Sequence, residues 1–169
     1  MRLETRRLLL RPVSIEEDLD EFVALHTDPE VTRFVYRFDR AEAEERLHRN
    51  EREWRERGHG MFAVLDGESG RFLGRAGLKH WPQFDETEVG WVLRRDAWGH
   101  GYATEAARAC IEWGLSDFDV PYLTAMINAA NLRSIRVAER LDLTPVRKDM
   151  LLDNPVVVYA TPPIDRVAT

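Results

Sequence analysis

Two glycines with one residue between them, Gly99 and Gly101, stand where the chain changes from extended to helical periodicity. The apolar segment Thr87–Leu93 precedes them, and a strongly periodic helical pattern follows them directly. Glycine permits a tight turn and lets a ligand approach the backbone, while the first N–H groups of a helix have no partner inside it. Because the helix dipole adds positive charge at the same place, this junction predicts a binding site for an anion such as a phosphate.

The residues of this turn resemble the acyl-CoA pyrophosphate loop of the GNAT acetyltransferases. That loop usually reads Arg or Gln, two residues, Gly, one residue, then Gly or Ala, and here Gly101 and Ala103 match its last two positions. Trp98 stands where Arg or Gln is usual. The departure is typical of the RimJ/RimL-like branch, and this chain reads Trp-Gly-His-Gly-Tyr-Ala-Thr-Glu-Ala from position 98.

A second block of resemblance begins at Asn131. The family usually shows Asn, two residues, Ser, and an amphipathic helix that closes with Leu-Gly-Phe, and this chain has Asn131, Ser134 and the close Leu141-Asp142-Leu143. Asp accepts a left-handed helix cap less readily than Gly, so this departure concerns helix termination more than a site. The opening Leu-Leu-Leu-Arg-Pro at residues 8–12 also resembles the family.

The resemblance implies an α/β (α+β) GNAT fold, with a mixed central sheet of about seven strands, splayed between strands 4 and 5, and about four helices on its faces. In the family the strand matching Thr87–Leu93 is bulged, for which Gly90 is suited, and the pantetheine arm of acetyl-CoA lies in the gap beside it. The residues that would contact CoA are Trp91, Val92, Leu93, Trp98, Gly99, His100, Gly101, Tyr102, Ala103, Thr104, Asn131 and Ser134.

Acyl transfer to an amine requires a held donor, a neutral amine and stabilisation of the oxyanion. We expect the donor's thioester carbonyl to accept an N–H group near Val92. An α-amine with a pKa near 8 is about a tenth neutral at pH 7, whereas a lysine amine is almost wholly charged, so an α-amine needs only a modest base. Glu88 alternates to the same face as Gly90 and Val92 and is the first candidate base. His80 and water are the alternatives.

Ser134 is the candidate for the leaving thiolate, because the family branch places a serine beside the CoA sulfur at the start of this helix. Plain helix capping is the alternative for both residues of this block, with Asn131 as N-cap and Ser134 at N3. Cys110 falls on the inner face of the preceding helix and is interpreted as a small buried hydrophobe, not a nucleophile.

Length and composition restrict the remaining functions. The 169 residues suit a single acetyltransferase domain, and with no apolar run above five residues we predict no membrane association. A net charge of −6 argues against nucleic-acid binding and permits a cationic acceptor. The lone Cys110 forms neither an internal disulfide nor a metal cluster, so we expect no metal and a cytoplasmic location. Relatives are often dimers, which leaves a homodimer open.

Periodicity predicts the remaining elements. We expect a strand at Leu8–Pro12, a helix to His26 that begins with a capping box at Ser14–Glu17, and an irregular aromatic segment at Val31–Phe38 that lines a cleft or fills the core. A solvated helix at Arg40–Arg57 carries Glu/Arg pairs four apart and ends at Gly58. The later segments are a hairpin at 61–65 and 72–81, a helix whose inner face is 103, 106, 107, 110, 111 and 114, strands at 122–127, near 146 and at 156–160, and a loose tail after Pro163.

Together these features predict an acetyl-CoA-dependent N-acetyltransferase that moves an acetyl group to a primary amine by direct attack on the thioester. A protein N-terminal α-amine is the favoured acceptor. The nearest alternative is a small-molecule acetyltransferase of the same fold, for an antibiotic, a polyamine or an amino acid. A non-catalytic acyl-CoA-binding sensor is an alternative of a different class.

Overall fold

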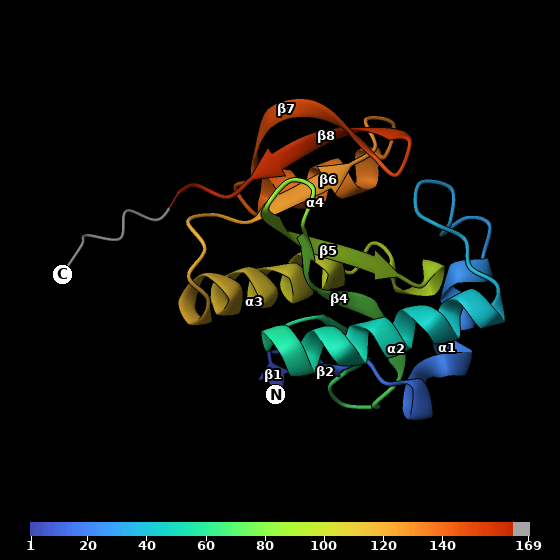
Figure 1. The fold of residues 1–169 in the computed structure, drawn as a ribbon. Coiled ribbons are helices and arrows are strands. Elements are labelled where there is room, and N and C mark those ends of the chain that lie inside the picture. Colours follow the sequence, from blue (N-terminus) through green and yellow to red (C-terminus); the bar gives the residue numbers. More distant parts are fainter. Residues whose placement is uncertain (164–169) are drawn as a thin grey trace.

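The computed structural model describes residues 1–163, which build one eight-stranded sheet in the order β1-β2-β3-β4-β5-β6-β8-β7 (Figure 1). All neighbouring strands are antiparallel except β5 and β6, which are parallel. The strands are β1 Leu3–Glu4, β2 Leu8–Pro12, β3 Met61–Asp66, β4 Phe72–Trp81, β5 Glu86–Leu93, β6 Thr124–Ile127, β7 Thr144–Leu151 and β8 Asn154–Ala160. The helices are α1 Ile15–Thr27, α2 Arg40–Arg57, the 3-10 turn η1 Arg95–Ala97, α3 Tyr102–Asp117 and α4 Leu132–Arg140.

The α/β prediction is confirmed, with eight strands in place of about seven. The additional strand is β1, whose two residues pair with Leu9 and Leu10 and are too short for alternation to be visible in the sequence. The four predicted helices all form. In the part of the chain that the structure describes, no helix is long and apolar enough to cross a membrane. The tail predicted after Pro163 lies outside the described residues.

The helices cover both faces of the sheet. α3 lies against β4 and β5 and buries Ala106, Ala107 and Cys110, while α1 and α2 enclose a second apolar cluster around Phe22, Phe38 and Leu47. Small residues bring α3 close to the sheet, since a Cβ added at Gly114 would meet Leu78 Cδ1 at 2.8 Å. Burial raises the pKa of the Cys110 thiol to about 12, so this cysteine packs and does not act as a nucleophile.

The start of α1 corrects one prediction. Ser14 Oγ accepts the Glu17 N–H at 3.2 Å as expected, but Asp18, not Glu17, accepts the Ser14 N–H, at 2.9 Å. Asp18 is buried and also binds the Arg11 guanidinium through both oxygens, so the capping box at Ser14–Glu17 is wrong. A complete capping box is found instead at α2, between Asp39 and Glu42.

The end of α2 is as predicted, with Gly58 at φ 72° in the left-handed region. Of the four predicted Glu/Arg pairs, one forms within 4.0 Å among the described residues, between Arg49 and Glu45. The Glu42 carboxylate accepts the Asp39 N–H instead of forming an ion pair with Arg46. After the end of helix α4, Asp142 lies in the left-handed region at φ 60°, a conformation that glycine more often supplies.

Candidate active site

The glycine turn between η1 and α3 presents a set of unused backbone donors. Gly99 and Gly101 have φ of 80° and 78°, a conformation that favours glycine. The first backbone bond of α3 runs from Glu105 N–H to Gly101 C=O, and among residues 1–163 the six N–H groups from Gly99 to Thr104 have no acceptor. Thr104 Oγ1 is also buried without a partner in the described chain. These donors fit a diphosphate.

The N-terminal strands fix this turn in place. Glu105 on α3 accepts bonds from Thr5 Oγ1 at 2.7 Å and from the backbone N–H and side chain of Arg7 at 2.9 and 2.7 Å. Burial alone would raise the pKa of Glu105, but these donors bring it below its usual value. Arg7 also donates to the His100 carbonyl at 2.9 Å. The negative charge of Glu105 is therefore offset by Arg7, and the start of α3 keeps the positive character of a helix N-terminus.

The sheet opens next to this turn. β5 and β6 share one parallel pair, Glu88 with Thr124, so the predicted splay is confirmed. β5 pairs with β4 without a register shift from Glu86 to Leu93, so the bulge predicted at Gly90 is wrong. The gap arises because β6 leaves the sheet, while β5 remains in place on β4.

The pairing on β4 decides which β5 amides face the gap. Arg94 N–H donates to Leu73 C=O, and an antiparallel ladder alternates, so the Val92 amide is directed at β4. The amides on either side, of Trp91 and Leu93, are directed at the gap and are the donors available to a ligand there. The Leu93 carbonyl accepts the Trp98 indole N–H at 3.0 Å, which ties β5 to the glycine turn.

Trp98 therefore has a structural reason to stand where the family usually has Arg or Gln. Its indole N–H donates to the Leu93 carbonyl at the end of β5. The Arg133 guanidinium of α4 lies over its ring, 3.4 Å from the centroid. The Leu93 side chain is buried in the core, so only its backbone is available at the gap. Gly90 opens on the cavity, because the nearest atom to an added Cβ is Met61 Cε at 3.6 Å.

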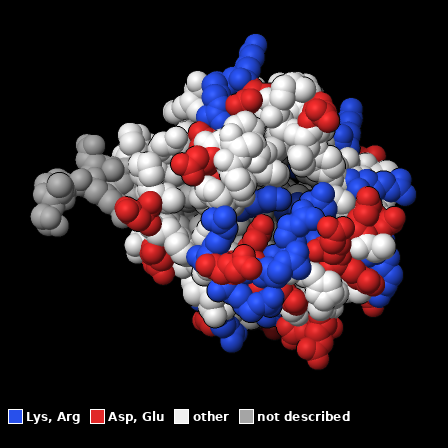
Figure 2. Space-filling view, in the orientation of Figure 1, with Lys and Arg blue, Asp and Glu red and all other residues white. Residues whose placement is uncertain are grey.

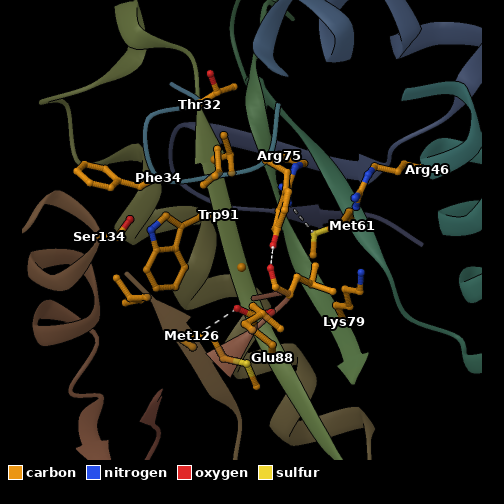
Figure 3. A pocket seen from close by; sticks show the side chains of 18 of the residues that line it. Thr32, Phe34, Arg46, Met61, Arg75, Lys79, Glu88, Trp91, Met126 and Ser134 are labelled. Atoms are coloured by element: carbon orange, nitrogen blue, oxygen red, sulfur yellow. Dashed lines mark hydrogen bonds between the residues drawn. The ribbon is translucent and has the colours of Figure 1, made fainter. Parts of the chain in front are cut away.

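Glu88 lies where the two strands separate. Its carboxylate accepts the Trp81 indole N–H at 2.6 Å and the backbone N–H of Met126 at 3.1 Å (Figure 3). In a continued parallel ladder the Met126 amide would donate to the Val89 carbonyl, so Glu88 takes the place of that acceptor. Burial raises the pKa of Glu88, opposed by these two bonds and by Lys79 and Arg75. A carboxyl whose pKa is raised in a cavity is suited to proton transfer.

Asn131 and Ser134 begin α4 on the other side of the gap. Asn131 Oδ1 caps the helix by accepting the Ser134 N–H at 3.2 Å, and its Nδ2 donates to Ser134 Oγ at 3.1 Å. Because Ser134 Oγ is an acceptor in this bond, its own O–H is left to donate elsewhere. Capping is therefore observed, and both side chains also line the cavity.

A cavity of about 480 Å³ extends from the gap toward α2. Its walls include β4, β5, β6, α2, the start of α4, the segment 32–38 and the β7–β8 turn. Segment 32–38 is held across the cavity because Tyr36 O–H donates to the Leu152 carbonyl at 2.8 Å and accepts from Asn154 Nδ2 at 2.9 Å. Phe38 and Val31 of the predicted aromatic segment are buried in the core, while Phe34 and Tyr36 face the cavity, so both alternatives for this segment hold.

Comparisons with known proteins decide the family. The Acetyltransferase (GNAT) domain family matches residues 7–144, which is most of the chain. The chain belongs to the GNAT acetyltransferase family.

This GNAT acetyltransferase has relatives that match it along nearly its whole length. It is 30% identical to the YkkB protein of Bacillus subtilis (strain 168) over 161 residues, covering 94% of both chains. The solved acetyltransferase from Agrobacterium tumefaciens str. C58 is 30% identical, with a TM-score of 0.82 and 95% and 93% of the two chains covered. RimL, a ribosomal L7/L12 α-N-protein acetyltransferase solved with CoA, shares the fold at 16% identity, with a TM-score of 0.79 over 95% and 97% of the chains.

The structure of this GNAT acetyltransferase separates the two predicted bases. Glu88 lines the cavity, but His80 does not, because it follows Lys79 on β4 and therefore faces the other side of the sheet. His80 lies instead 3.9 Å from the carboxylate of Asp85. The structure therefore favours Glu88 over His80 as the candidate base.

Four cavity-side residues of the GNAT acetyltransferase were absent from the sequence-based prediction: His26, Arg46, Arg75 and Lys79. His26 is fully buried beneath the cavity, where its Nδ1 lies 3.0 Å from the Tyr36 carbonyl and its Nε2 accepts from Arg75 Nε at 3.0 Å. Burial and the neighbouring Arg75 lower the pKa of His26 to about 3, so it is neutral and donates to Tyr36. Alternation along Arg75, Gly77 and Lys79 was the signal that would have found two of them.

Proposed function

We propose that this GNAT protein transfers the acetyl group of acetyl-CoA to a primary amine by direct attack on the thioester. The proposal depends on one observation, which is that three parts of the site are connected. Six unused amides at Gly99–Thr104 lie beside the gap between β5 and β6, and this gap leads into the cavity that Glu88 lines. Donor, reaction centre and acceptor would then occupy one path.

At the donor end, the amides of the glycine turn would hold the diphosphate and the edge of β5 would hold the pantetheine arm. Acetyl-CoA supplies the acetyl group already activated as a thioester. The Trp91 and Leu93 amides are the groups placed to polarise its carbonyl, because they are fixed by the β4 pairing and face the gap. The solved CoA complex of RimL, which has the same fold, supports CoA as the donor.

In the cavity, Glu88 would take the proton from the attacking amine, directly or through water. The raised pKa of this carboxyl brings it closer to that of an α-amine, which makes the proton transfer easier. The hydrogen bonds from Trp81 and Met126 hold both carboxylate oxygens near the gap. The same carboxylate would therefore hold the two strands in position and accept the proton. Ser134 Oγ accepts from Asn131 Nδ2, so the Ser134 O–H is available and would donate to the leaving sulfur.

For the acceptor, we favour a protein N-terminal α-amine over a lysine side chain. A far larger fraction of an α-amine is neutral at pH 7, so a single carboxylate base suffices. RimL, a structural neighbour, is named as an α-N-protein acetyltransferase.

The test is thiol release from acetyl-CoA with a panel of amines and peptides of different N-termini. We expect acceptor-dependent release that is fastest with α-amines. Clear CoA binding without release for any amine would contradict the proposal and favour an acyl-CoA sensor. Fastest release with polyamines or lysine side chains would instead contradict the choice of acceptor.

A further inference from the structure

The side chains around the acceptor end of the cavity are cationic, although the whole chain carries a formal charge of −6. Six Arg or Lys side chains and two Glu side chains line it. The cationic ones are Arg33, Arg37, Arg46, Arg49, Arg75 and Lys79. Figure 2 shows Lys and Arg side chains gathered at the edge of the hollow on this face. The acceptor site is thus opposite in charge to the protein that contains it.

Arg75 is the most enclosed of these cations. Its Nε donates to His26 Nε2 at 3.0 Å and its Nη1 lies 3.6 Å from the Met61 sulfur, so both observed partners are uncharged. No carboxylate of residues 1–163 lies within 4.0 Å of it. Burial lowers the pKa of Arg75 to about 10, which still leaves the guanidinium charged at pH 7. Among the described residues, Glu88 is the one carboxylate whose charge acts on Arg75, and it lies beyond salt-bridge distance. A partly buried guanidinium without a direct carboxylate partner is costly, and a bound anion would offset that cost.

Arg46 and Lys79 also lack a direct carboxylate partner within residues 1–163, although Glu42 and Glu45 act on Arg46 and Glu53 and Glu88 act on Lys79 from a greater distance. The Arg46 guanidinium lies over the Phe38 ring at 3.8 Å, and Lys79 Nζ lies over the Trp81 ring at 4.1 Å. Neither has a carboxylate within salt-bridge distance in the described chain, whereas Arg11, Arg94 and Arg147 outside the cavity each do. In Figure 3 Arg46, Arg75 and Lys79 lie together on one side of the cavity, opposite Trp91 and Ser134.

The strand register relates these cations to the reaction centre. Lys79 pairs with Glu88 across β4 and β5, and Arg75 pairs with Val92, so Arg75 lies about 13 Å along the strand from Lys79. Arg75 and Glu88 line the same cavity, so an acceptor whose amine is held at Glu88 would extend along this face of the sheet toward the Arg75 guanidinium. Guanidinium groups bind carboxylates through two parallel hydrogen bonds, and Arg75 and Arg46 have N–H groups free for such a contact.

We propose that the acceptor is a primary amine that carries a carboxylate close to the amine, bound by Arg75 and Arg46. This proposal rests on the proposed acetyltransferase activity and narrows its substrate class. Two sources share this chemistry: a peptide whose first or second residue is Asp or Glu, and a free amino acid with its α-carboxylate. Polyamines and peptides with basic N-termini are disfavoured, because they would place further positive charge among unpaired cations.

The first experiment compares kcat/KM by thiol release for C-terminally amidated peptides that begin with Asp, Glu, Ser or Lys, and for free amino acids. We expect the acidic acceptors to exceed the Ser peptide at least about tenfold and the Lys peptide at least about a hundredfold. A preference for free amino acids over amidated acidic peptides would assign the carboxylate to the α-carboxyl group. Equal rates for Ser and acidic peptides, or a preference for Lys, would overturn the proposal.

Binding of the acetylated products separates this proposal from the acetyltransferase activity itself. Calorimetry in the presence of CoA needs no turnover, and we expect N-acetylated acidic peptides and amino acids to bind at least about tenfold more tightly than the neutral N-acetyl peptide. Failure of thiol release with this preference intact would remove the catalytic proposal only. Equal affinities would remove the carboxylate site only.

Two variants test the residues. In Arg46→Met and Arg75→Met we expect kcat/KM for the acidic acceptor to fall at least about tenfold more than kcat/KM for the Ser peptide, so that the preference for the acidic acceptor is lost. Arg75 also binds His26, so Arg46→Met provides the test if the other variant does not fold. Arg40→Met is the matched control, since Arg40 lies on the same helix but pairs with Asp20 on the surface. An unchanged acidic preference in a folded Arg46→Met variant would contradict the assignment.

Discussion

The two ends of the active-site path are built from different materials. The donor end, around Gly99–Thr104, offers backbone N–H groups of one short turn and the exposed edge of β5. The acceptor end, around Arg75, offers side chains from β4, α2, segment 32–38 and the β7–β8 turn. Backbone N–H groups are the same whatever the side chains are, so the ligand of a backbone site changes little when residues are substituted. The ligand of a side-chain site can change with each substitution. The donor end therefore suits a fixed substrate, and the acceptor end suits a variable one.

The largest expected effect lies at the donor end. Gly101→Asp would place a Cβ at φ 78° and a carboxylate among donors meant for phosphate, so we expect CoA affinity to fall more than about a hundredfold by calorimetry. Gly70→Asp is the matched control, because Gly70 has φ 71° in an open hairpin turn. Unchanged CoA affinity in Gly101→Asp would contradict the placement of the diphosphate.

Glu88→Gln tests the proposed proton acceptor, which lies between the donor end and the acceptor end. The amide oxygen of Gln can still accept from Trp81 or Met126, but the proton acceptor is lost, so we expect kcat to fall about a hundredfold. Activity of the native enzyme should rise with pH through the raised pKa of Glu88, and this acid limb should be absent in the variant. An acid limb that stays in place would leave water or another group as the base.

Ser134→Ala tests whether α4 contributes chemistry as well as a cap. Asn131 Oδ1 caps through the Ser134 backbone N–H, which the variant keeps, so we expect turnover to slow about twentyfold with little change in CoA affinity. Ser116→Ala on the exposed side of α3 is the control. Equal turnover in Ser134→Ala and the native enzyme would remove Ser134 from the mechanism.

The smallest expected effect concerns the support of the acceptor end. His26 has a pKa of about 3 in the fold and about 6.5 when unfolded, so below pH 6.5 the unfolded chain binds a proton that the fold does not. The free energy of unfolding should therefore fall as the pH drops below about 7.5. His26 alone should lower it by about 1.4 kcal/mol between pH 7.5 and pH 5.5. Urea unfolding of His26→Gln should lack this component. An identical pH dependence in both proteins would mean that the fold does not lower the pKa of His26.

The donor end could be predicted from the sequence because its determinants are local. Gly99, Gly101 and the helix that follows are adjacent in the chain, and the position of a helix N-terminus follows from periodicity. The same locality explains the success at Gly58 and at the Asn131 cap. Where the expectation depended on a distant partner, as for the Ser14 amide that binds Asp18 in place of a capping box, it was wrong.

The acceptor end could not be predicted, because its residues meet only through strand register and loop placement. Alternation along β4 divides Lys79 from His80, but the sequence does not say which of the two faces the cavity, and a one-residue difference exchanges the faces. Arg46 shares a helix with eleven other charged residues, and only the position of Phe38 beneath it marks it as different. The net charge of −6 gave no sign of a cationic cavity.

The bond between Glu88 and the Met126 amide has a consequence for how this enzyme can change. The carboxylate accepts the amide that would otherwise pair with β5, so an acceptor at position 88 helps to keep β5 and β6 apart where we propose that the donor binds. If an apolar residue replaced Glu88, the Met126 amide would be free to donate to the Val89 carbonyl, and β5 and β6 would pair further along their length. The proposed proton acceptor and the group that holds β5 and β6 apart are therefore one side chain, and only a replacement that keeps a hydrogen-bond acceptor at this position, as Gln does, would separate the two roles.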